Sequence, residues 1–318
     1  HTHWRYGCCD VLTYLQNGYG CWLNIISSRT QNMSFLSILQ DSPVFFVSCT
    51  TILGLMVGSF LNVVIHRLPE MMKRNWLQQC AELQGEAMQT LPEFNLFTPR
   101  SRCIHCGHKI TAWENIPVIS YLFLRGRCSQ CHASISPRYP VVEAATAIIS
   151  GFVAWHFGYG FVALAALIFV WSLIALAAID LDTQLLPDDI TLPLLWIGLL
   201  VNINHGFTDI QSAVIGAIAG YLSLWSIYWC FKLMTGKEGM GYGDFKLLAA
   251  IGAWLGWGML PLVILSSSLV GALVGMGLIL AAKLNKNIPI PFGPYLVGGA
   301  LIALFWGEQL IHTYIGLL

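Results

Sequence analysis

The run FVALAALIFVWSLIALAAI occupies residues 161–179, carries no charged side chain, and is followed at once by DLDTQLLPDD, residues 180–189. A helix rises about 1.5 Å per residue, so about 20 apolar residues cross the roughly 30 Å hydrocarbon core of a membrane. The run therefore predicts a membrane-spanning helix that ends in a cluster of carboxylates. The whole chain agrees, because 56% of its 318 residues are hydrophobic and only 10% are charged, against about 25% in soluble domains.

This composition excludes an ordinary soluble protein and also a disordered one, because 12 Trp, 16 Phe and 11 Tyr carry too much apolar surface to stay solvated as coil. Sixteen Lys plus Arg balance sixteen Asp plus Glu, so the net charge gives no reason to expect nucleic acid as a partner. Membrane lipid is the expected surrounding of most of the chain.

The hydropathy pattern predicts an all-α polytopic membrane protein with about eight spans. The runs are Val44 to Ile65, Pro140 to Tyr159, Phe161 to Ile179, Ile190 to Ile203, Ser212 to Phe231, Phe245 to Trp257, Leu260 to Ala282 and Tyr295 to Leu318. The fourth and the sixth are short for a crossing and could be tilted or partly re-entrant.

The basic residues orient these spans, because Lys and Arg accumulate in loops that stay in the cytoplasm. From Met33 onward, nine lie between the first two runs and five in later loops; the nine are Arg67, Lys73, Arg74, Arg100, Arg102, Lys109, Arg125, Arg127 and Arg138, and the five are Lys232, Lys237, Lys246, Lys283 and Lys286. Eight alternating spans put all fourteen on one side. We therefore expect both chain ends to face away from the cytoplasm.

Four segments follow from this pattern. Residues 1–32 are expected to be a non-native or disordered tail, 33–65 the first transmembrane helix, 66–139 a cytoplasmic zinc-binding domain, and 140–318 a seven-helix membrane core. A genuine, weakly ordered tail is the alternative for the first segment.

Two cysteine pairs in the polar interval have metal-ligand spacing. Cys103 and Cys106 form one C-x-x-C pair, Cys128 and Cys131 form another, and 21 residues separate the pairs. Two such turns can present four thiolates to one tetrahedral Zn²⁺, which would leave no open position and would be structural. Disulfides are the alternative, although a reducing cytoplasm disfavours them. The neighbouring His105, His108 and His132 either replace a ligand or face solvent.

Two acidic clusters lie at predicted helix ends, where carboxylates are expensive to desolvate and are therefore functional candidates. The first holds Asp180, Asp182, Asp188 and Asp189; in the second, Gly239, Gly241 and Gly243 precede Asp244. Two carboxylates from different helices could meet and share one proton, as aspartyl proteolysis requires. The glycines would allow close backbone approach and unusual torsions. Lys246 could bias the protonation state or anchor at the interface.

Helix capping is the plain alternative for each of these acids. Asp244 opens a predicted helix, and Asp188 and Asp189 follow the turn at Pro187, so each could be an N-cap. Capping explains any one residue about as well as catalysis does, but it does not explain the paired clusters together with the glycines.

An ordered set of motifs resembles one family. The strings are GSFLNVVIHRLP (58–69), the two C-x-x-C pairs, ISPRYPVVEA (135–144), AAIDLDTQLLPDDITLP (177–193), EGMGYGDFKLL (238–248) and IPFGPYL (290–296). In this order they look like the bacterial type IV prepilin leader peptidases, membrane aspartyl proteases of the Gly-x-Gly-Asp type. The resemblance runs from Met33 to the C-terminus; His66 stands where an aromatic is often expected.

The resemblance implies a bifunctional enzyme of the bacterial inner membrane. Such an enzyme removes the leader peptide of prepilins and type II secretion pseudopilins after a glycine. It then N-methylates the new terminus, commonly phenylalanine, with S-adenosyl-L-methionine. The family match implies Asp180 and Asp244 as the catalytic pair, a choice that spacing alone does not make, and Cys103, Cys106, Cys128 and Cys131 as the zinc ligands.

The methyl-donor site is much less visible in the sequence. No strand-glycine-helix pattern of soluble cofactor folds is apparent, so we expect a site at the cytoplasmic membrane edge. Glu143 is a candidate participant, and a partner for Arg138 is its alternative role. Residues Pro291 to Pro294 cannot form regular helix and could present backbone to an extended substrate; a simple interhelical loop is the alternative.

Two rival functions differ in kind from a protease. A proton- or cation-coupled transporter would use the acidic pair, but it would need carboxylates near the middle of the membrane. A zinc-bearing scaffold for pilus or secretion assembly would share the zinc site and would lack activity.

Overall fold

The computed structural model describes residues 35–85, 93–111, 113–237, 239–282 and 291–316. The chain divides into two units, His1–Phe46 and Val47–Leu318. In the first unit the described residues form α2, Phe35–Asp41, and the start of α3. The expected tail, residues 1–32, lies outside the described residues.

The second unit is helical, and its described residues contain no β-strand. The helices are α3 (Pro43–Gln84, which begins in the first unit), α4 (Ile119–Phe123), α5 (Arg138–Phe157), α6 (Phe161–Thr183), α7 (Asp188–Ile203), α8 (Ile210–Thr235), α9 (Tyr242–Leu255), a 3-10 turn at Trp257–Met259, α10 (Leu260–Ala282) and α11 (Gly293–Gly316). The expected all-α fold is confirmed.

Six of these helices are long and apolar enough to cross a membrane, so the protein is a multi-pass membrane protein. They are α3, α5, α6, α8, α10 together with the preceding turn, and α11. Of the eight predicted spans, these six are long enough to cross, and the two runs expected to be tilted or partly re-entrant correspond to α7 and α9. With 16 and 14 residues, α7 and α9 are about 24 and 21 Å long, less than the roughly 30 Å hydrocarbon core.

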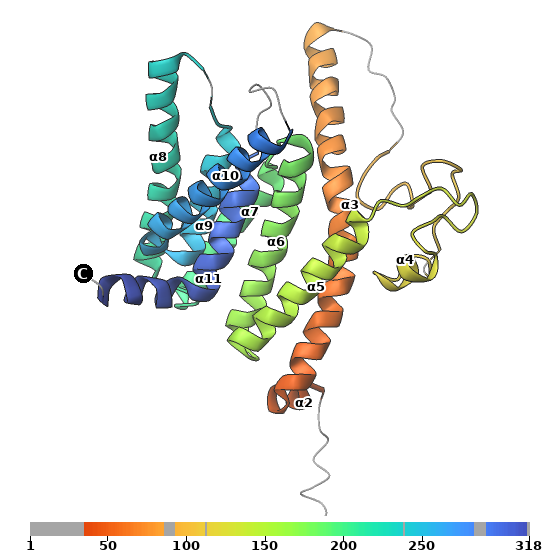
Figure 1. The fold of residues 1–318 in the computed structure, drawn as a ribbon, viewed down its shortest axis with the longest axis horizontal. Coiled ribbons are helices and arrows are strands. Elements are labelled where there is room, and N and C mark those ends of the chain that lie inside the picture. Colours follow the sequence, from red (N-terminus) through yellow and green to blue (C-terminus); the bar gives the residue numbers. More distant parts are fainter. Residues whose placement is uncertain (1–34, 86–92, 112, 238, 283–290, 317–318) are drawn as a thin grey trace, which may run out of the picture. The chain divides into compact units, whose positions relative to one another are not determined.

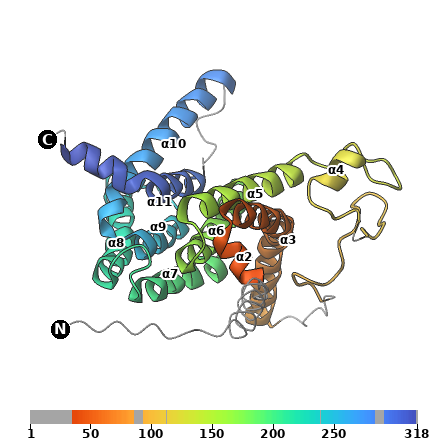
Figure 2. The ribbon, with the colours of Figure 1, turned by 90° about the horizontal axis from the view of Figure 1, so that it is seen from below.

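Helix α9 is the centre of the helical bundle. Nearly all of its residues from Asp244 to Leu255 are buried, and α7, α8, α10 and α11 pack around it (Figure 2). A helix that is apolar on all sides needs such a position. Its short length therefore agrees with a place enclosed by other helices, where they and not lipid surround its backbone.

Small residues let α8 and α9 approach closely. An added Cβ at Gly216 of α8 would lie 2.3 Å from the Gly252 carbonyl oxygen of α9, and one at Gly252 would lie 2.2 Å from the Gly216 oxygen. In lipid, helices associate through close packing of such residues. The outer surface of α10 differs, because Leu265, Leu269 and Leu273 are exposed at helical spacing, as a lipid-facing side requires.

Helices α7 and α9 run side by side in the same direction. At their starts, the Lys246 Nζ of α9 lies 2.7 Å from both carboxylate oxygens of Asp188 on α7. At their ends, the buried Asn202 amide of α7 donates to the carbonyls of Ala253 and Trp254. The starts of α7 and α9 therefore lie at the same level.

The polar interval is more helical than the sequence suggested. Helix α3 continues beyond the predicted end at Ile65, through Pro69, to Gln84. The described residues between α3 and α5, 93–111 and 113–137, lie beside these two helices as loops with the short helix α4 (Figures 1 and 2). Two isolated bridges, Arg102 with Lys109 and Arg127 with Ser134, are the only β-type pairings among these described residues.

Candidate active site and metal centre

The fold brings Asp180 and Asp244 together. Asp180 lies in the last turn of α6 and Asp244 in the first turn of α9. Both are buried, with 5% and 7% of their surface exposed, and their carboxyl groups are close enough to interact electrostatically. Close carboxylates cannot both ionise freely, so two acids in this arrangement can share a proton. The meeting of two acids from different helices agrees with the sequence prediction.

The start of α11 positions the Asp180 carboxyl group. The Gly293 backbone N–H donates to Asp180 Oδ2 at 3.0 Å, in a buried hydrogen bond. An added Cβ at Gly293 would lie 2.6 Å from the same oxygen, so only glycine fits without a shift. A helix N-terminus also favours negative charge. The segment Pro291 to Pro294 therefore contacts a candidate catalytic acid, a role that the sequence did not predict. The prediction that this segment cannot form regular helix is wrong for Gly293 and Pro294, which are the first two residues of α11, because proline is tolerated in the first turn of a helix.

The glycines before Asp244 serve close packing and not unusual torsion. An added Cβ at Gly243 would lie 2.7 Å from the Leu186 Cβ, and one at Gly239 would lie 2.9 Å from the Phe231 ring. The predicted close approach is confirmed. The predicted unusual torsion is wrong for Gly241 and Gly243, because Gly241 has φ −83° and Gly243 lies within α9.

The alternative that Asp244, Asp188 or Asp189 is a helix N-cap is also wrong. Gly241 is the N-cap of α9 and Pro187 that of α7, and neither helix has a side-chain cap hydrogen bond. Asp188 instead pairs with Lys246, so Lys246 links two helices. Asp189 is exposed.

Asp182 and Glu143 occupy different environments. The Arg138 guanidinium at the start of α5 pairs with Asp182, and its Nη2 also donates to the Ala178 carbonyl at 3.0 Å. Glu143 is buried with 8% exposed, and its Oε2 accepts from the Val118 backbone N–H at 2.7 Å. Arg138 thus pairs with Asp182, and the alternative role of Glu143 as its partner is not realised.

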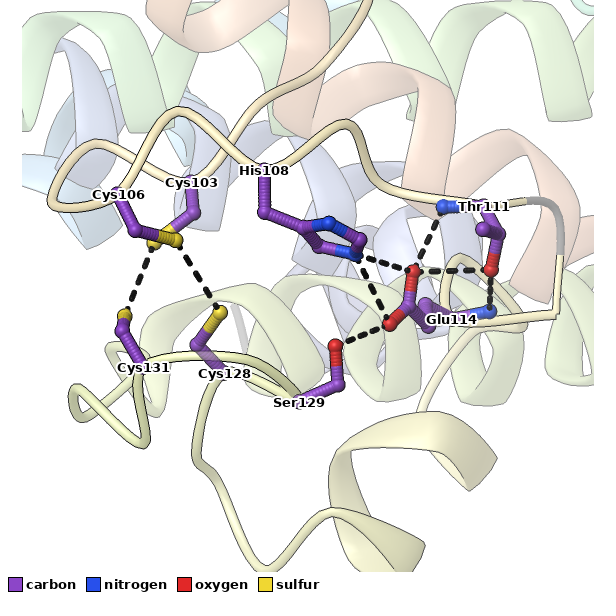
Figure 3. A network of polar contacts seen from close by, with 8 residues as sticks. All are labelled: Cys103, Cys106, His108, Thr111, Glu114, Cys128, Ser129 and Cys131. Atoms are coloured by element: carbon purple, nitrogen blue, oxygen red, sulfur yellow. Dashed lines mark hydrogen bonds and ion pairs between the residues drawn. The ribbon is translucent and has the colours of Figure 1, made fainter.

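The four cysteines form one cluster. All four Sγ atoms lie within 4.8 Å of one another; Cys103 and Cys131 are 3.7 Å apart, and Cys106 and Cys128 are 4.0 Å apart (Figure 3). These separations are too long for disulfides. A tetrahedron with Zn–S bonds of about 2.3 Å has edges of about 3.8 Å. The cluster therefore has the size of a four-thiolate zinc site.

Each cysteine pair sits on a tight turn. The Gly107 N–H donates to the Cys103 carbonyl, and the His132 N–H donates likewise to Cys128. Both residues have positive φ, 71° and 56°. Glycine adopts this conformation readily, whereas histidine does so at a cost. The two turns are thus equivalent, and the histidine after Cys131 takes a backbone position and not a ligand position.

Hydrogen bonds prepare the first thiol of each pair for metal binding. Backbone N–H groups of Cys106 and His105 lower the pKa of Cys103 to about 6, and those of Cys131 and Gln130 lower the pKa of Cys128. For Cys131 the Ala133 backbone lowers the pKa, but burial and the three neighbouring thiols outweigh it and raise the pKa to about 12. Four thiolates without a cation repel one another, so full ionisation requires a metal.

Glu114 ties the two cysteine turns together. Its carboxylate accepts from the Thr111 N–H at 2.7 Å and the Thr111 hydroxyl at 2.9 Å. It also contacts His108 on the first turn and the Ser129 hydroxyl on the second (Figure 3). The Ser129 and Thr111 hydrogen bonds lower the pKa of Glu114 to about 2. Glu114 was not among the predicted site residues, although Thr-x-x-Glu at residues 111–114 is a capping-box signature.

A cavity of about 660 Å³ lies between the cysteine turns and the membrane helices. Its lining includes Ser59, Asn62 and His66 of α3, Tyr139 and Glu143 of α5, and Tyr121 of α4. The volume is in the range of small-molecule sites, roughly 300–1,000 Å³. This cavity could not be predicted from local sequence patterns, because its walls come from segments far apart in the chain.

Family models match most of the chain. Residues 52–157 match the Bacterial Peptidase A24 N-terminal domain, which includes the four cysteines and Glu143. Residues 167–276 match the Type IV leader peptidase family, which includes Asp180 and Asp244.

Several curated relatives share the name prepilin leader peptidase/N-methyltransferase. The protein of Stutzerimonas stutzeri is 56% identical over 284 residues, and that of Pseudomonas aeruginosa 55%; each match covers 89% of this chain and 98% of the relative. The Aeromonas hydrophila protein is 55% identical over 282 residues, 88% of this chain and 97% of its own. No solved structure matches the chain significantly.

Proposed function

This chain belongs to the type IV leader peptidase family, and we propose that it removes the leader peptide of type IV prepilins and pseudopilins after a glycine. It then N-methylates the new terminal residue, commonly phenylalanine, with S-adenosyl-L-methionine. We place it in the bacterial inner membrane with its active site at the cytoplasmic face, where the predicted loops hold the Lys and Arg residues.

The burial of Asp180 and Asp244, close enough for their carboxyl groups to interact electrostatically, is the observation that supports this proposal. One carboxylate, ionised, takes a proton from water as the water oxygen attacks the scissile carbonyl carbon. The other, protonated, donates its proton to the carbonyl oxygen. Two acids that share one proton are suited to this exchange. Gly293 holds Asp180 through its backbone N–H and so orients one of the two acids.

The substrate must reach this pair in extended form, because helical hydrogen bonds would hide the scissile carbonyl. Pro291 and Phe292 are suited to receive it, since they lie outside α11 and directly before its first residue, Gly293. Because Gly293 contacts Asp180, a bound strand would lie beside the catalytic pair.

We propose that Cys103, Cys106, Cys128 and Cys131 hold a structural Zn²⁺. The Sγ separations fit a tetrahedral four-thiolate shell, which leaves no vacancy for water or substrate. The ion would join the two turns of a segment that has few long apolar runs and little core of its own.

The position of the acids also argues against the transporter alternative. Asp180 and Asp244 lie at helix ends, in the last turn of α6 and the first turn of α9. A proton- or cation-coupled transporter would place them near the middle of the bilayer.

The proposal is tested with purified protein in detergent, a prepilin substrate and S-adenosyl-L-methionine. We expect a gel shift from leader loss and mass addition of one methyl group at the new terminus. Asp189→Asn is the matched control for the aspartates, because Asp189 lies in the same cluster and is exposed; it should cleave normally. A wild-type protein that folds and binds zinc but neither cleaves nor methylates would favour the scaffold alternative.

A further inference from the structure

The 660 Å³ cavity has no part in the peptidase chemistry, yet a buried acid lies in its wall. Asp180 and Asp244 are not among its lining residues. The cavity is bounded by α3, the start of α5, α4 and the cysteine turns. A second reaction needs its own site, and this cavity is large enough to enclose a nucleoside-sized ligand.

Two carboxylates line the cavity, and one of them already accepts several hydrogen bonds from the cysteine turns. Glu114 receives hydrogen bonds from Thr111 and Ser129 and contacts His108, so its oxygens serve the cysteine turns. Glu143 is the other. It lines the cavity, and its Oε2 accepts from the Val118 backbone N–H. Ser59 and Asn62 are the other hydrogen-bond partners of its carboxyl group, whereas a carboxylate offers about four acceptor positions. Glu143 therefore retains acceptor capacity for a ligand.

The backbone around Glu143 is held firmly. Gly58 of α3 approaches so closely that an added Cβ would lie 2.8 Å from the Glu143 Cα. The Asn62 amide donates to the Tyr139 carbonyl at 3.1 Å, one turn before Glu143, and Ser59 and Asn62 lie within hydrogen-bonding reach of the carboxyl group. Three residues of α3 thus fix the carboxylate in the cavity wall.

The chemistry of methyl transfer calls for such a group. The donor has a positively charged sulfonium, and the acceptor is an α-amino group with a pKa near 8, so at neutral pH it is mostly an ammonium ion. An ammonium nitrogen has no free electron pair and cannot attack a methyl carbon. A buried carboxylate beside the donor attracts the ammonium ion and can accept its proton.

We propose that this cavity binds S-adenosyl-L-methionine and that Glu143 binds and deprotonates the new N-terminus of the cleaved pilin. This inference rests on the proposed function. The Glu143 carboxylate takes one proton from the terminal ammonium. The freed nitrogen electron pair forms a bond to the methyl carbon while the carbon–sulfur bond breaks, its electrons going to sulfur. The products are a methylated ammonium, a neutral thioether and protonated Glu143, which returns its proton to water.

The fold connects the two reactions through Arg138. Arg138 begins α5, pairs with Asp182 and donates to the Ala178 carbonyl of α6, on either side of Asp180. The helix that carries Glu143 is therefore fastened to the helix that carries Asp180. Arg138, which contacts the residues on either side of Asp180, precedes Glu143 by five residues on α5.

Three variants of the full chain in detergent test the inference. Ser120→Trp fills the cavity and should weaken binding of labelled S-adenosyl-L-methionine at least about tenfold, with prepilin cleavage retained. Glu143→Gln should bind the donor within about twofold of wild type and cleave normally. Its methyl transfer to a synthetic peptide with N-terminal phenylalanine should fall about 100-fold, as for loss of a general base. Glu308→Gln, an exposed acid on α11, should match wild type.

A second measurement uses the wild-type chain, so it depends neither on enzyme activity nor on whether a variant folds. Ultraviolet crosslinking of labelled S-adenosyl-L-methionine to the wild-type chain should label peptides that hold lining residues, within residues 59–67, 94–110 or 114–143. Label found only elsewhere, or normal donor binding by a folded Ser120→Trp, would overturn the cavity assignment. Normal methyl transfer by Glu143→Gln would overturn its role, and so would loss of donor binding by that variant. A wild-type chain with neither cleavage nor transfer would refute the proposed function instead.

Discussion

Replacing Gly293 by alanine tests the link between α11 and the acid pair. The new Cβ would lie 2.6 Å from Asp180 Oδ2, which is 0.8 Å short of the 3.4 Å at which ordinary contact begins. The carboxyl group must move by about that much, and a displacement of about 1 Å can cost about 100-fold in rate. Loss of the charged hydrogen bond from the Gly293 N–H would cost about 1.5–3 kcal/mol, or about 10- to 150-fold.

We therefore expect Gly293→Ala to lower kcat/KM for prepilin cleavage by about 100-fold. Initial rates of leader loss from purified protein measure this effect, and methyl transfer to a pre-cleaved peptide should stay at the wild-type rate. Gly298→Ala is the matched control on the same helix, because no atom lies within 4 Å of its added Cβ. Cleavage by Gly293→Ala within about twofold of wild type, or an equal loss in the control, would refute the reasoning.

Three further predictions concern the metal site and the packing of α7. The double substitution Cys103→Ser with Cys128→Ser should remove about one equivalent of zinc in metal analysis, whereas Cys80→Ser with Cys230→Ser, both exposed cysteines, should keep it; unchanged zinc in the first variant would contradict a four-thiolate site. Glu114→Gln should speed zinc release to a chelator, because the carboxylate joins the two cysteine turns; an unaltered release rate would show that the turns do not depend on it. Asn202→Ala should lower stability by about 3 kcal/mol, because its amide serves four backbone groups; thermal unfolding should show a clear loss for this variant and little for Asn204→Ala, and equal shifts would contradict this explanation.

Hydropathy predicted the helical class and six of the spans, because lipid imposes length and composition on each segment separately. It overestimated α7 and α9, since a short helix enclosed by other helices is as apolar as one in lipid. It also ended the first helix at Ile65, because hydropathy detects where the apolar run stops and not where helical hydrogen bonding stops. The cysteine spacing predicted a metal cluster because each turn is local.

The candidate active site could be predicted only in part, because its geometry depends on contacts between distant parts of the chain. Chemistry and family motifs pointed to Asp180 and Asp244, but spacing could not choose among the acids of the first cluster. The contacts that hold these side chains join distant parts of the chain, such as Gly293 with Asp180 and Val118 with Glu143. No local pattern encodes such pairs. The cavity could not be predicted for the same reason, since residues of α3, α4 and α5 line it together.

The central claim is that Asp180 and Asp244 act as one unit. Prepilin cleavage should therefore be measured for Asp180→Asn, Asp244→Asn and the double variant under identical conditions, with methyl transfer to a pre-cleaved peptide as the test of folding. Each single variant should lose at least about 1,000-fold, and the double variant should be no slower than either, because a unit fails when one member is lost. Substantial cleavage by either single variant, or losses that multiply in the double variant, would contradict the claim.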